Sequence, residues 1–259
     1  MKKHTMLSEI WRRFKKNKQA VVGLIVLIIF ILVAIFAKQI APYWYDDQDA
    51  SRAMIGPCAQ YPFGTDNLGR DVLSRILYGG RASILLSLAS AILSLGVGLV
   101  IGLFCGFYGG KLDMLCTVSS NIFQGIPGSC FMIAIAGIFG PSIKSLVLAL
   151  VITSWAGFSR IVRAEVMQLK EEPFIEGLRC LGCSDSRLLL HHIIPNIVNK
   201  LLILFTIRVG RGILSIAGLS FLGLGVQPPT PDWSVMVSDA VLYYRSSPHL
   251  IFLLPTCHQ

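Results

Sequence analysis

Residues 160–196, RIVRAEVMQLKEEPFIEGLRCLGCSDSRLLLHHIIPN, form a polar stretch between long apolar segments. Pro173 opens a short helical segment within this stretch, and Glu176, Gly182 and the exit at Pro195 follow in order. The apolar segments on either side are long enough to cross a membrane. We therefore interpret the polar stretch as the place where a soluble partner binds a membrane protein.

The composition assigns the chain to the membrane proteins. Hydrophobic residues make up 54% and charged residues 14% of its 259 residues, more apolar surface than a soluble domain of this size can bury. The basic residues before the first apolar run are Lys2, Lys3, Arg12, Arg13, Lys15, Lys16 and Lys18. Such a cluster is typical of a signal for membrane orientation. The net charge of +9 therefore does not indicate a nucleic-acid partner.

The cysteines show no paired framework. Cys105, Cys116 and Cys130 lie in apolar segments, where cysteine behaves as a small hydrophobe. Cys180 and Cys183 have the CxxC spacing, but neither a second cysteine pair nor a histidine pair at zinc-finger spacing accompanies them. We predict no metal site and no cofactor.

Five apolar segments are predicted to cross the membrane, which makes the chain an all-α, polytopic helical bundle. The first, residues 20–37, forms about 27 Å of helix and is interpreted as a retained span rather than a signal peptide. The other spans are predicted at about residues 82–108, 114–139, 144–157 and 195–218, and the fourth continues to Arg160 and Arg163 at its inner end. Pro127 is expected to kink the third. Residues 1–19 are then cytoplasmic, residues 38–81 external, and residues 82–259 the main transmembrane domain.

Glycines recur at every fourth position of the second span, at Gly98, Gly102, Gly106 and Gly110. This spacing predicts a helix face without side chains, on which a neighbouring helix packs closely. The pair Gly110-Lys111 is not part of a nucleotide-binding loop, because leucine follows the lysine and the required preceding glycine is absent.

The external loop ends in the segment Phe63–Arg75, FGTDNLGRDVLSR. Thr65 or Asp66 is expected to cap a helix that begins near Asn67. We prefer to interpret this helix as a surface element whose arginines, Arg75 and Arg81, face lipid headgroups. The alternative is an external gate or docking element. Its candidate residues are Gly69, Arg70 and Asp71.

Three motifs in the same order resemble one family. Residues 160–196 resemble the cytoplasmic EAA loop of the membrane subunits of bacterial ABC importers. Residues 63–75 look like the GTDxxGRD segment of the dipeptide/oligopeptide/nickel branch. Residues 220–233, SFLGLGVQPPTPDW, are similar to that branch's SFLGLGxQPPTPxWG, with Ser234 in place of the last glycine. The resemblance is to the C-type permease and covers about residues 8–250.

The resemblance implies the transmembrane domain of a type I ABC importer in the bacterial inner membrane, with its N-terminus cytoplasmic. The chain would form half of a pore for short peptides or nickel chelates, with a homologous B-type permease as the other half. Two ATP-binding subunits would hydrolyse ATP, and an extracytoplasmic binding protein would deliver substrate. The chain itself would be non-catalytic and would contact membrane lipid but no nucleic acid.

In this family the loop at residues 160–195 forms a coupling helix that lies in a groove of the ATPase. The candidate ATPase-coupling residues are Glu176, Arg179, Gly182 and Asp185. Glu176 and Arg179 are three residues apart on one helix face, and Gly182 can end the helix. Leu178 stands where the family has alanine and is expected to alter the docking fit by its bulk. The alternative is a merely solvated loop.

Arg208 and Arg211 lie on one face of the fifth span. Arg208 is about 18 Å along the helix from Asn196, near the middle of the bilayer. An unsatisfied arginine there costs roughly 2.5–3.5 kcal/mol, so both should face a wet cavity or a carboxylate. Two interpretations are equally supported. Either the arginines line the translocation path and attract substrate carboxylates, or they are paired within the bundle.

The rival class is a secondary transporter or channel without an ATPase, in which Arg208 and Arg211 would be the ion-linked groups. The docking loop and the lack of an acidic intramembrane residue count against it. The family continues with a sixth span, whereas here a short apolar run, residues 249–255, precedes Gln259. We therefore expect a chain shortened after five crossings, without the last span.

Overall fold

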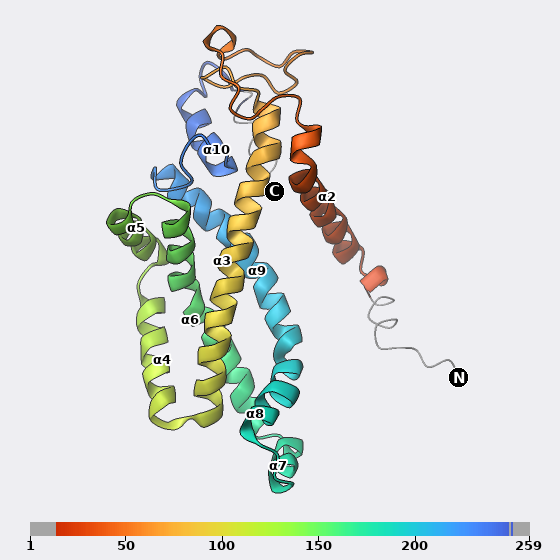
Figure 1. Ribbon diagram of the computed structural model, residues 1–259, viewed down its shortest axis with the longest axis vertical. Helices are drawn as coiled ribbons and strands as arrows, with labels where there is room; N and C mark the ends of the chain where they lie inside the picture. The colour runs from red at the N-terminus through yellow and green to blue at the C-terminus, as the bar shows by residue number, and fades with distance from the viewer. Residues whose placement is uncertain (1–13, 249, 251–259) are drawn as a thin grey trace, which may run out of the picture. The chain divides into compact units, whose positions relative to one another are not determined.

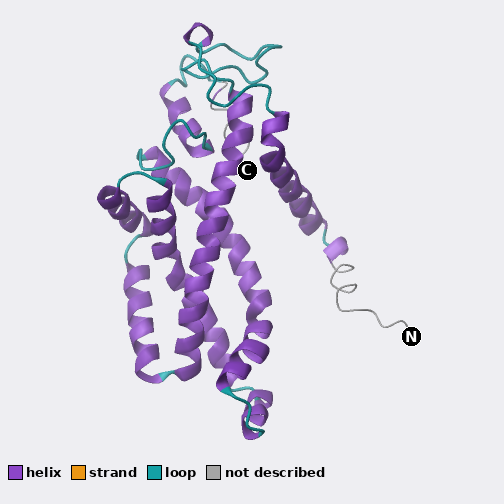
Figure 2. Cartoon of the chain, viewed as in Figure 1, coloured by secondary structure: helices purple, strands orange, loops and turns teal. Residues whose placement is uncertain are grey.

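The protein is described from a computed structural model, which covers residues 14–248 and residue 250. In this part of the chain the secondary structure is helical, and the sole β feature is an isolated bridge between Thr65 and Asp71 (Figures 1 and 2). The α-helices are α2 (Lys18–Ile40), α3 (Val72–Tyr108), α4 (Gly110–Gly125), α5 (Gly128–Phe139), α6 (Ile143–Lys170), α7 (Pro173–Cys180), α8 (Asp185–Arg187), α9 (Ile194–Phe221) and α10 (Trp233–Leu242). The short elements are a 3-10 turn η1 (Ala50–Arg52) and a π-helical turn η2 (Leu188–Ile193). The all-α prediction is confirmed.

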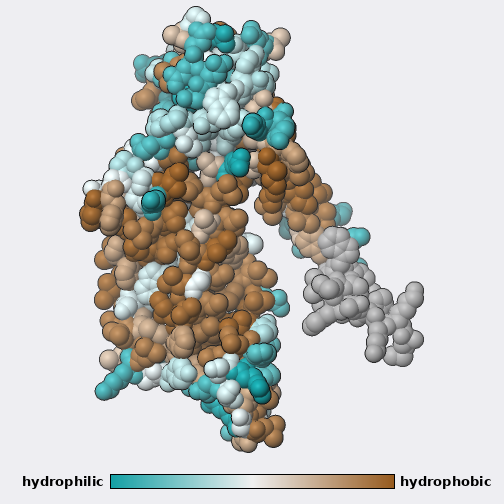
Figure 3. All heavy atoms as spheres, viewed as in Figure 1, coloured by the Kyte–Doolittle hydropathy of each residue, from teal (hydrophilic) through white to brown (hydrophobic). Residues whose placement is uncertain are grey.

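The chain forms two compact units. One contains residues 82–242, and the other contains residues 1–81 and 243–259, as far as they are described. Four helical stretches are long and apolar enough to cross a membrane, and the pair α4–α5 makes a fifth if it counts as one span. In the larger unit, hydrophobic residues cover the visible outer surface of the helices, and hydrophilic residues gather around α7 (Figure 3). The residues up to Arg13 and most of the final run, 249 and 251–255, lie outside the described residues.

The second span begins earlier than predicted, and the helix expected from Asn67 is absent. Helix α3 starts at Val72 and continues without a break to Tyr108. Its start is set by Asp71, whose Oδ2 accepts hydrogen bonds from the backbone N–H and the hydroxyl of Ser74 at 2.8 and 2.6 Å. The predicted separate surface helix was therefore wrong, because the capping carboxylate is Asp71 and not Asp66.

The predicted kink at Pro127 is a break of 87° between α4 and α5. Ile126 has an extended backbone with ψ 131°, the conformation that a following proline favours. Pro127 has no N–H to continue the helix of α4, and α5 begins at the next residue. The pair is either one broken span or a re-entrant hairpin by length and composition.

The fourth helix continues through Arg160 and Arg163 as predicted, and α6 extends beyond them to Lys170. A capping box between Ser142 and Ser145 fixes its start. The first part of the polar stretch is thus helical and continuous with the membrane span. Only from Glu171 onward does the chain leave α6 and turn into α7.

The predicted glycine face packs α3 against α6. A Cβ atom on Gly98 would lie 2.4 Å from Cβ of Phe158, and one on Gly102 would lie 2.6 Å from the carbonyl oxygen of Ser159. Gly106 meets α6 in the same way, one turn farther along. Gly110 does not belong to this face: it opens α4 with φ +61°, and a Cβ there would have no neighbour within 4 Å.

Two of the cysteines expected to be unpaired form a disulfide. Cys105 on α3 and Cys116 on α4 are bonded across the turn that joins the two helices. Their 11-residue separation is bridged because α3 and α4 run side by side in opposite directions around Gly109 and Gly110 (Figure 1). Cys180 and Cys183 are both free.

Candidate functional site

The helix α7 forms a small projection at one end of the larger unit (Figure 1). Pro173 occupies its first turn, where a missing N–H costs nothing and the fixed φ favours helix. After Cys180, Gly182 adopts φ +80°, and its N–H donates to the carbonyl of Arg179 at 2.9 Å. Gly182 therefore ends the helix, as predicted.

One face of α7 is anchored in the hydrophobic core of the larger unit. Ile175 is fully buried in a cluster with residues of α3, α6, η2 and α9. Leu178, three residues later, packs against the same cluster. The effect of Leu178 on the docking fit stays a prediction; its bulk packs against this core and attaches α7 to the bundle.

The opposite face of α7 is open. Glu176, Gly182 and Asp185 are all exposed, as residues that bind a partner must be. Two apolar residues accompany them: Phe174 is 45% exposed and Leu181 is 85% exposed. Leu181 was missed by sequence reasoning, because a leucine after a short helix reads as core; its place beyond the helix end, next to Gly182, is the signal that could have found it.

Arg179 does not pair with Glu176. Its guanidinium carbon lies 5.2 Å from the ring centroid of Phe107, near the end of α3. Lys170, at the end of α6, donates from Nζ to the carbonyl oxygen of Phe107 at 2.7 Å. Phe107 thus receives a contact from α6 and one from α7, and Arg179, although exposed, links α7 to α3.

Arg208 and Arg211 on α9 have different surroundings. Arg208 is half-buried and lies against α6, with its guanidinium carbon 5.7 Å from the ring centroid of Phe158. The space for it exists because residue 157 is glycine: a Cβ there would lie 2.1 Å from Nη2 of Arg208. Arg211 is exposed. The two arginines are therefore not equivalent, although they share a helix.

The candidate residues of the segment at residues 63–75 are largely buried rather than exposed on the surface. Arg70 and Asp71 are 5% and 3% exposed. Nε of Arg70 donates to Oδ2 of Asp66 at 2.8 Å, and Nη1 lies 3.5 Å from Asp46. Gly69 adopts φ +74°, and a Cβ there would lie 1.9 Å from the carbonyl oxygen of Asp49. These residues hold the loop together from within.

The arginine expected to face lipid headgroups, Arg75, is 4% exposed and lies 3.5 Å from Asp66, so that prediction was wrong. Arg81 is exposed. The physical reason is the carboxylate: Asp66 faces both Arg70 and Arg75, and a buried cation needs such a partner.

The third motif, residues 220–233, ends in a buried acid. Asp232 is fully buried, and its Oδ2 accepts from the hydroxyl of Ser83 on α3 at 2.7 Å. Its other oxygen accepts from the N–H of Ser234 and caps α10. This motif residue therefore fastens α10 to α3.

Comparison with known proteins agrees with these motifs. Residues 98–257 match the family described as "Binding-protein-dependent transport system inner membrane component". The chain belongs to this family. Residues 5–58 also match the N-terminal TM domain of oligopeptide transport permease C. The C-type resemblance drawn from the three motifs is thereby confirmed, and the protein is a multi-pass membrane permease.

Two relatives show how far the similarity extends. The dipeptide transport system permease protein DppC of Alkalihalophilus pseudofirmus is 39% identical over 240 residues, 93% of this chain and 79% of that protein. The glutathione transport system permease protein GsiD of Escherichia coli O1:K1 is 38% identical over 243 residues, 93% of this chain and 80% of that protein.

A solved structure shares the fold. A chain of the MetNI methionine ABC transporter, in an inward-facing conformation, superposes with a TM-score of 0.55 over 71% of this chain and 93% of that chain. The sequence identity is 16%, so the likeness concerns the arrangement of the helices alone. This arrangement is that of an ABC transporter permease.

Proposed function

We propose that this chain is one permease subunit of an ATP-driven importer for short peptides, of the dipeptide or glutathione type. The proposal is supported by the family membership and by the transport names of its relatives. A homologous permease would complete the pore, two ATP-binding subunits would supply the energy, and an extracytoplasmic binding protein would deliver the peptide. ATP hydrolysis would take place on the partner subunits.

The observation that carries the proposal is the two-sided character of α7. Its inner face, with Ile175 and Leu178, is embedded in a core that includes α3, α6 and α9. Its outer face offers Glu176 and Leu181 to solvent. A protein that grips the outer face can therefore move several membrane helices at once through the inner face.

The orientation follows from this role. An ATPase works in the cytoplasm, so α7 would lie on the cytoplasmic side of the inner membrane. The basic residues ahead of α2 would then also be cytoplasmic, in agreement with the positive-inside rule. The break between α4 and α5 would lie inside the bilayer, where protein neighbours satisfy its open backbone groups.

The substrate would pass along α9, near Arg208 and Arg211. Arg211 is exposed at about the depth where a membrane protein can keep a charge only in water or beside an anion. A peptide carboxylate is such an anion. Arg208 is held on Phe158 and would set the local potential rather than bind directly.

The test is stimulation of the ATPase in the assembled transporter. Leu181→Asp places a charge in the contact, and it should reduce stimulation by substrate-loaded binding protein about tenfold while leaving the permease folded. Leu242→Asp is the matched control, since this leucine is 77% exposed at the end of α10. Equal stimulation in both variants would remove α7 as the docking element.

Capture of the purified chain from its native membranes separates the remaining classes. An importer permease co-purifies with an ATP-binding subunit, whereas a secondary transporter or channel does not. Uptake of a labelled dipeptide against nickel then decides the substrate. Dipeptide uptake is the expected result, and nickel uptake without dipeptide uptake would assign the other substrate class implied by the motifs.

A further inference from the structure

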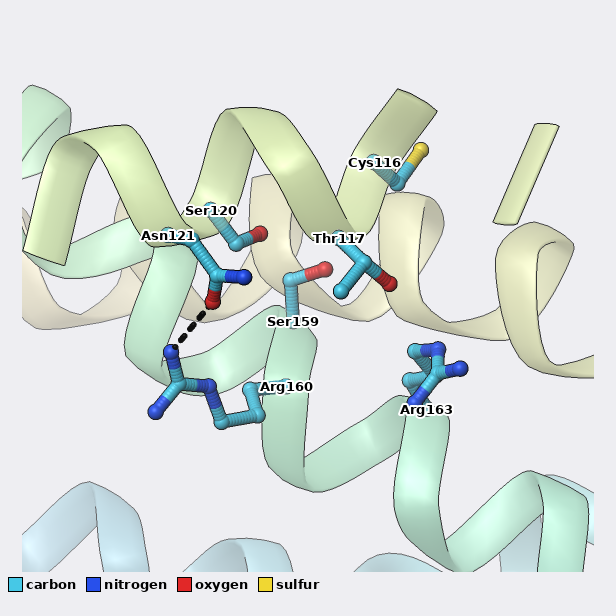
Figure 4. A pocket seen from close by; sticks show the side chains of 7 residues that line it. All are labelled: Cys116, Thr117, Ser120, Asn121, Ser159, Arg160 and Arg163. Atoms are coloured by element: carbon cyan, nitrogen blue, oxygen red, sulfur yellow. Dashed lines mark hydrogen bonds between the residues drawn. The ribbon is translucent and has the colours of Figure 1, made fainter. Parts of the chain in front are cut away.

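A polar cavity of about 150 Å³ lies between α4 and α6, away from α7 and from Arg208. It is lined by Cys116, Thr117, Ser120, Asn121, Ser159, Arg160 and Arg163. Figure 4 shows hydroxyl and amide groups of α4 directed at the serine and arginines of α6. Arg160 is about 15 Å from the Lys170 end of α6 and about 25 Å from its other end, so it lies where the membrane span passes into the polar stretch.

The two arginines of the cavity differ in charge balance. Arg163 is neutralised, because its guanidinium forms a two-point ion pair with Asp113, with Nη2 2.6 Å from Oδ2. Arg160 donates from Nη2 to the amide oxygen of Asn121 at 3.0 Å. Within residues 14–248 it has no carboxylate partner. An amide orients the guanidinium but does not cancel its charge.

A further polar group in the cavity has unused capacity. Oγ1 of Thr117 is buried and has no hydrogen-bond partner among the described residues. Buried hydroxyl groups in proteins are nearly always hydrogen-bonded, so an atom of this kind indicates a missing donor or acceptor. The side chains of Ser120 on α4 and Ser159 on α6 also line the cavity, and these residues are 5% and 3% exposed. The cavity therefore combines one uncompensated cation with a hydroxyl that lacks its partner.

The volume of the cavity is sufficient for a small acidic group. About 150 Å³ corresponds to roughly five water molecules at about 30 Å³ each. This space is enough for a carboxylate and the carbon that carries it. Next to it, Phe123 lies 5.3 Å from Phe131 and 5.4 Å from Trp155 between ring centroids. This aromatic cluster offers an apolar surface for the rest of a ligand whose charged end occupies the cavity.

We propose that this cavity is a subsite for the carboxylate of the peptide in transit, with Arg160 as the binding cation, Asn121 as the residue that orients it, and Thr117 as an additional hydrogen-bonding group. The inference rests on the proposed import of short peptides. A guanidinium presents two parallel N–H donors to a carboxylate, which makes arginine suited to this group.

The test measures charge at the cavity directly. Ser120→Cys is introduced into a chain whose cysteines other than Cys105 and Cys116 are serine, and the full transporter is placed in vesicles. With each rate divided by the rate of the same reagent with a free thiol in solution, negatively charged sulfonatoethyl methanethiosulfonate should label this cysteine about tenfold faster than the trimethylammonium analogue, because a cationic cleft concentrates anions. Arg160→Gln should equalise the two rates, and Arg160→Lys should keep the preference. Val118→Cys, 50% exposed on α4, is the control and should show none.

Protection by substrate identifies the ligand. During ATP turnover with binding protein present, saturating dipeptide should slow labelling at position 120 about fivefold and leave position 118 unaffected. Equal labelling with and without dipeptide would overturn the subsite. Slowing by phosphatidylglycerol in the vesicles, with no effect of dipeptide, would overturn it in favour of a lipid anion.

ATPase activity in the same vesicles separates this inference from the proposed function. If dipeptide-loaded binding protein stimulates ATP hydrolysis but does not protect position 120, the subsite alone is wrong. If no stimulation occurs, the proposed function itself fails.

Discussion

Two regions carry family motifs and present them in opposite ways. Around α7, the motif residues Glu176 and Gly182 are exposed, whereas in the segment at residues 63–75 the motif residues Arg70 and Asp71 are 5% and 3% exposed. Both regions are polar and lie between apolar helices. The difference shows that a polar motif in a membrane protein marks either a surface that binds a partner or a loop that must satisfy its own charges. Burial distinguishes the two.

The largest expected loss of stability is at Arg70, in the buried segment. Arg70→Ala leaves Asp66 without its closest cation in a mostly buried site, and removal of one partner of such a pair costs roughly 3–5 kcal/mol. The apparent Tm of the purified protein should fall markedly. Arg52→Ala is the control, because its ion pair with Asp49 is 40% exposed on the arginine side and an exposed pair contributes little to stability. Equal loss in both variants would show that the segment is not held together by its buried charges.

The two motif glycines test the same contrast. Both have positive φ, but a Cβ on Gly69 would lie 1.9 Å from Asp49, whereas one on Gly182 would have no neighbour within 4 Å. Gly69→Ala should destabilise the protein by about 3 kcal/mol, from backbone strain and overpacking together. Gly182→Ala should cost about 1–2 kcal/mol from strain alone. Chemical denaturation of both variants measures the difference; equal losses would contradict it.

A smaller effect is expected where α7 meets α3. Phe107→Leu removes the aromatic face under Arg179, a loss of about 0.5–1 kcal/mol, and leaves a small void because leucine is smaller than the buried ring. The local opening rate of α7 should rise, which hydrogen exchange of its backbone amides detects. Phe104→Leu is a control, since Phe104 is 48% exposed on the same helix. Unchanged exchange in Phe107→Leu would mean that the core contacts of Ile175 hold α7 alone.

The smallest effect concerns acid stability near η1. Hydrogen bonds from the hydroxyl and the backbone N–H of Ser51 lower the pKa of Asp49 below its ordinary value. The ionised form is thus favoured in the folded state, so this contribution is present above the unfolded pKa of about 3.9 and is lost as the pH falls through the folded one. Ser51→Ala should raise the pKa of Asp49, which carboxyl NMR titration measures. An unchanged pKa would contradict this account.

The spans and the glycine face could be predicted, because length, hydropathy and a four-residue repeat are local properties of the chain. Gly98, Gly102 and Gly106 pack on α6 as expected. The burial of Arg70 could not be predicted, since it depends on Asp46, far away in sequence, as well as on Asp66. The start of α3 at Val72 was missed because Thr65, Asp66 and Asp71 are all acceptable caps, and only the folded loop selects among them.

For α7, the position of the motif could be predicted from the sequence, but not which face of the helix is buried. Ile175 and Leu178 are three residues apart, and this spacing already assigns them to one helix face. Which face is buried depends on the core that α6, η2 and α9 build around it. The cavity beside Arg160 was also missed, because its lining comes from two helices whose contact no local pattern encodes.

The contact of Gly98, Gly102 and Gly106 with α6 has a consequence for motion. Because hardly any side chain separates the two backbones, the helices cannot slide past each other by changes of side-chain conformation. This part of α3 and α6 must therefore move as one rigid body. A movement of α7 must then be accommodated by a change of backbone angle at another point of the chain. The 87° break between α4 and α5 at Pro127 offers such a point, although both helices also pack against α6.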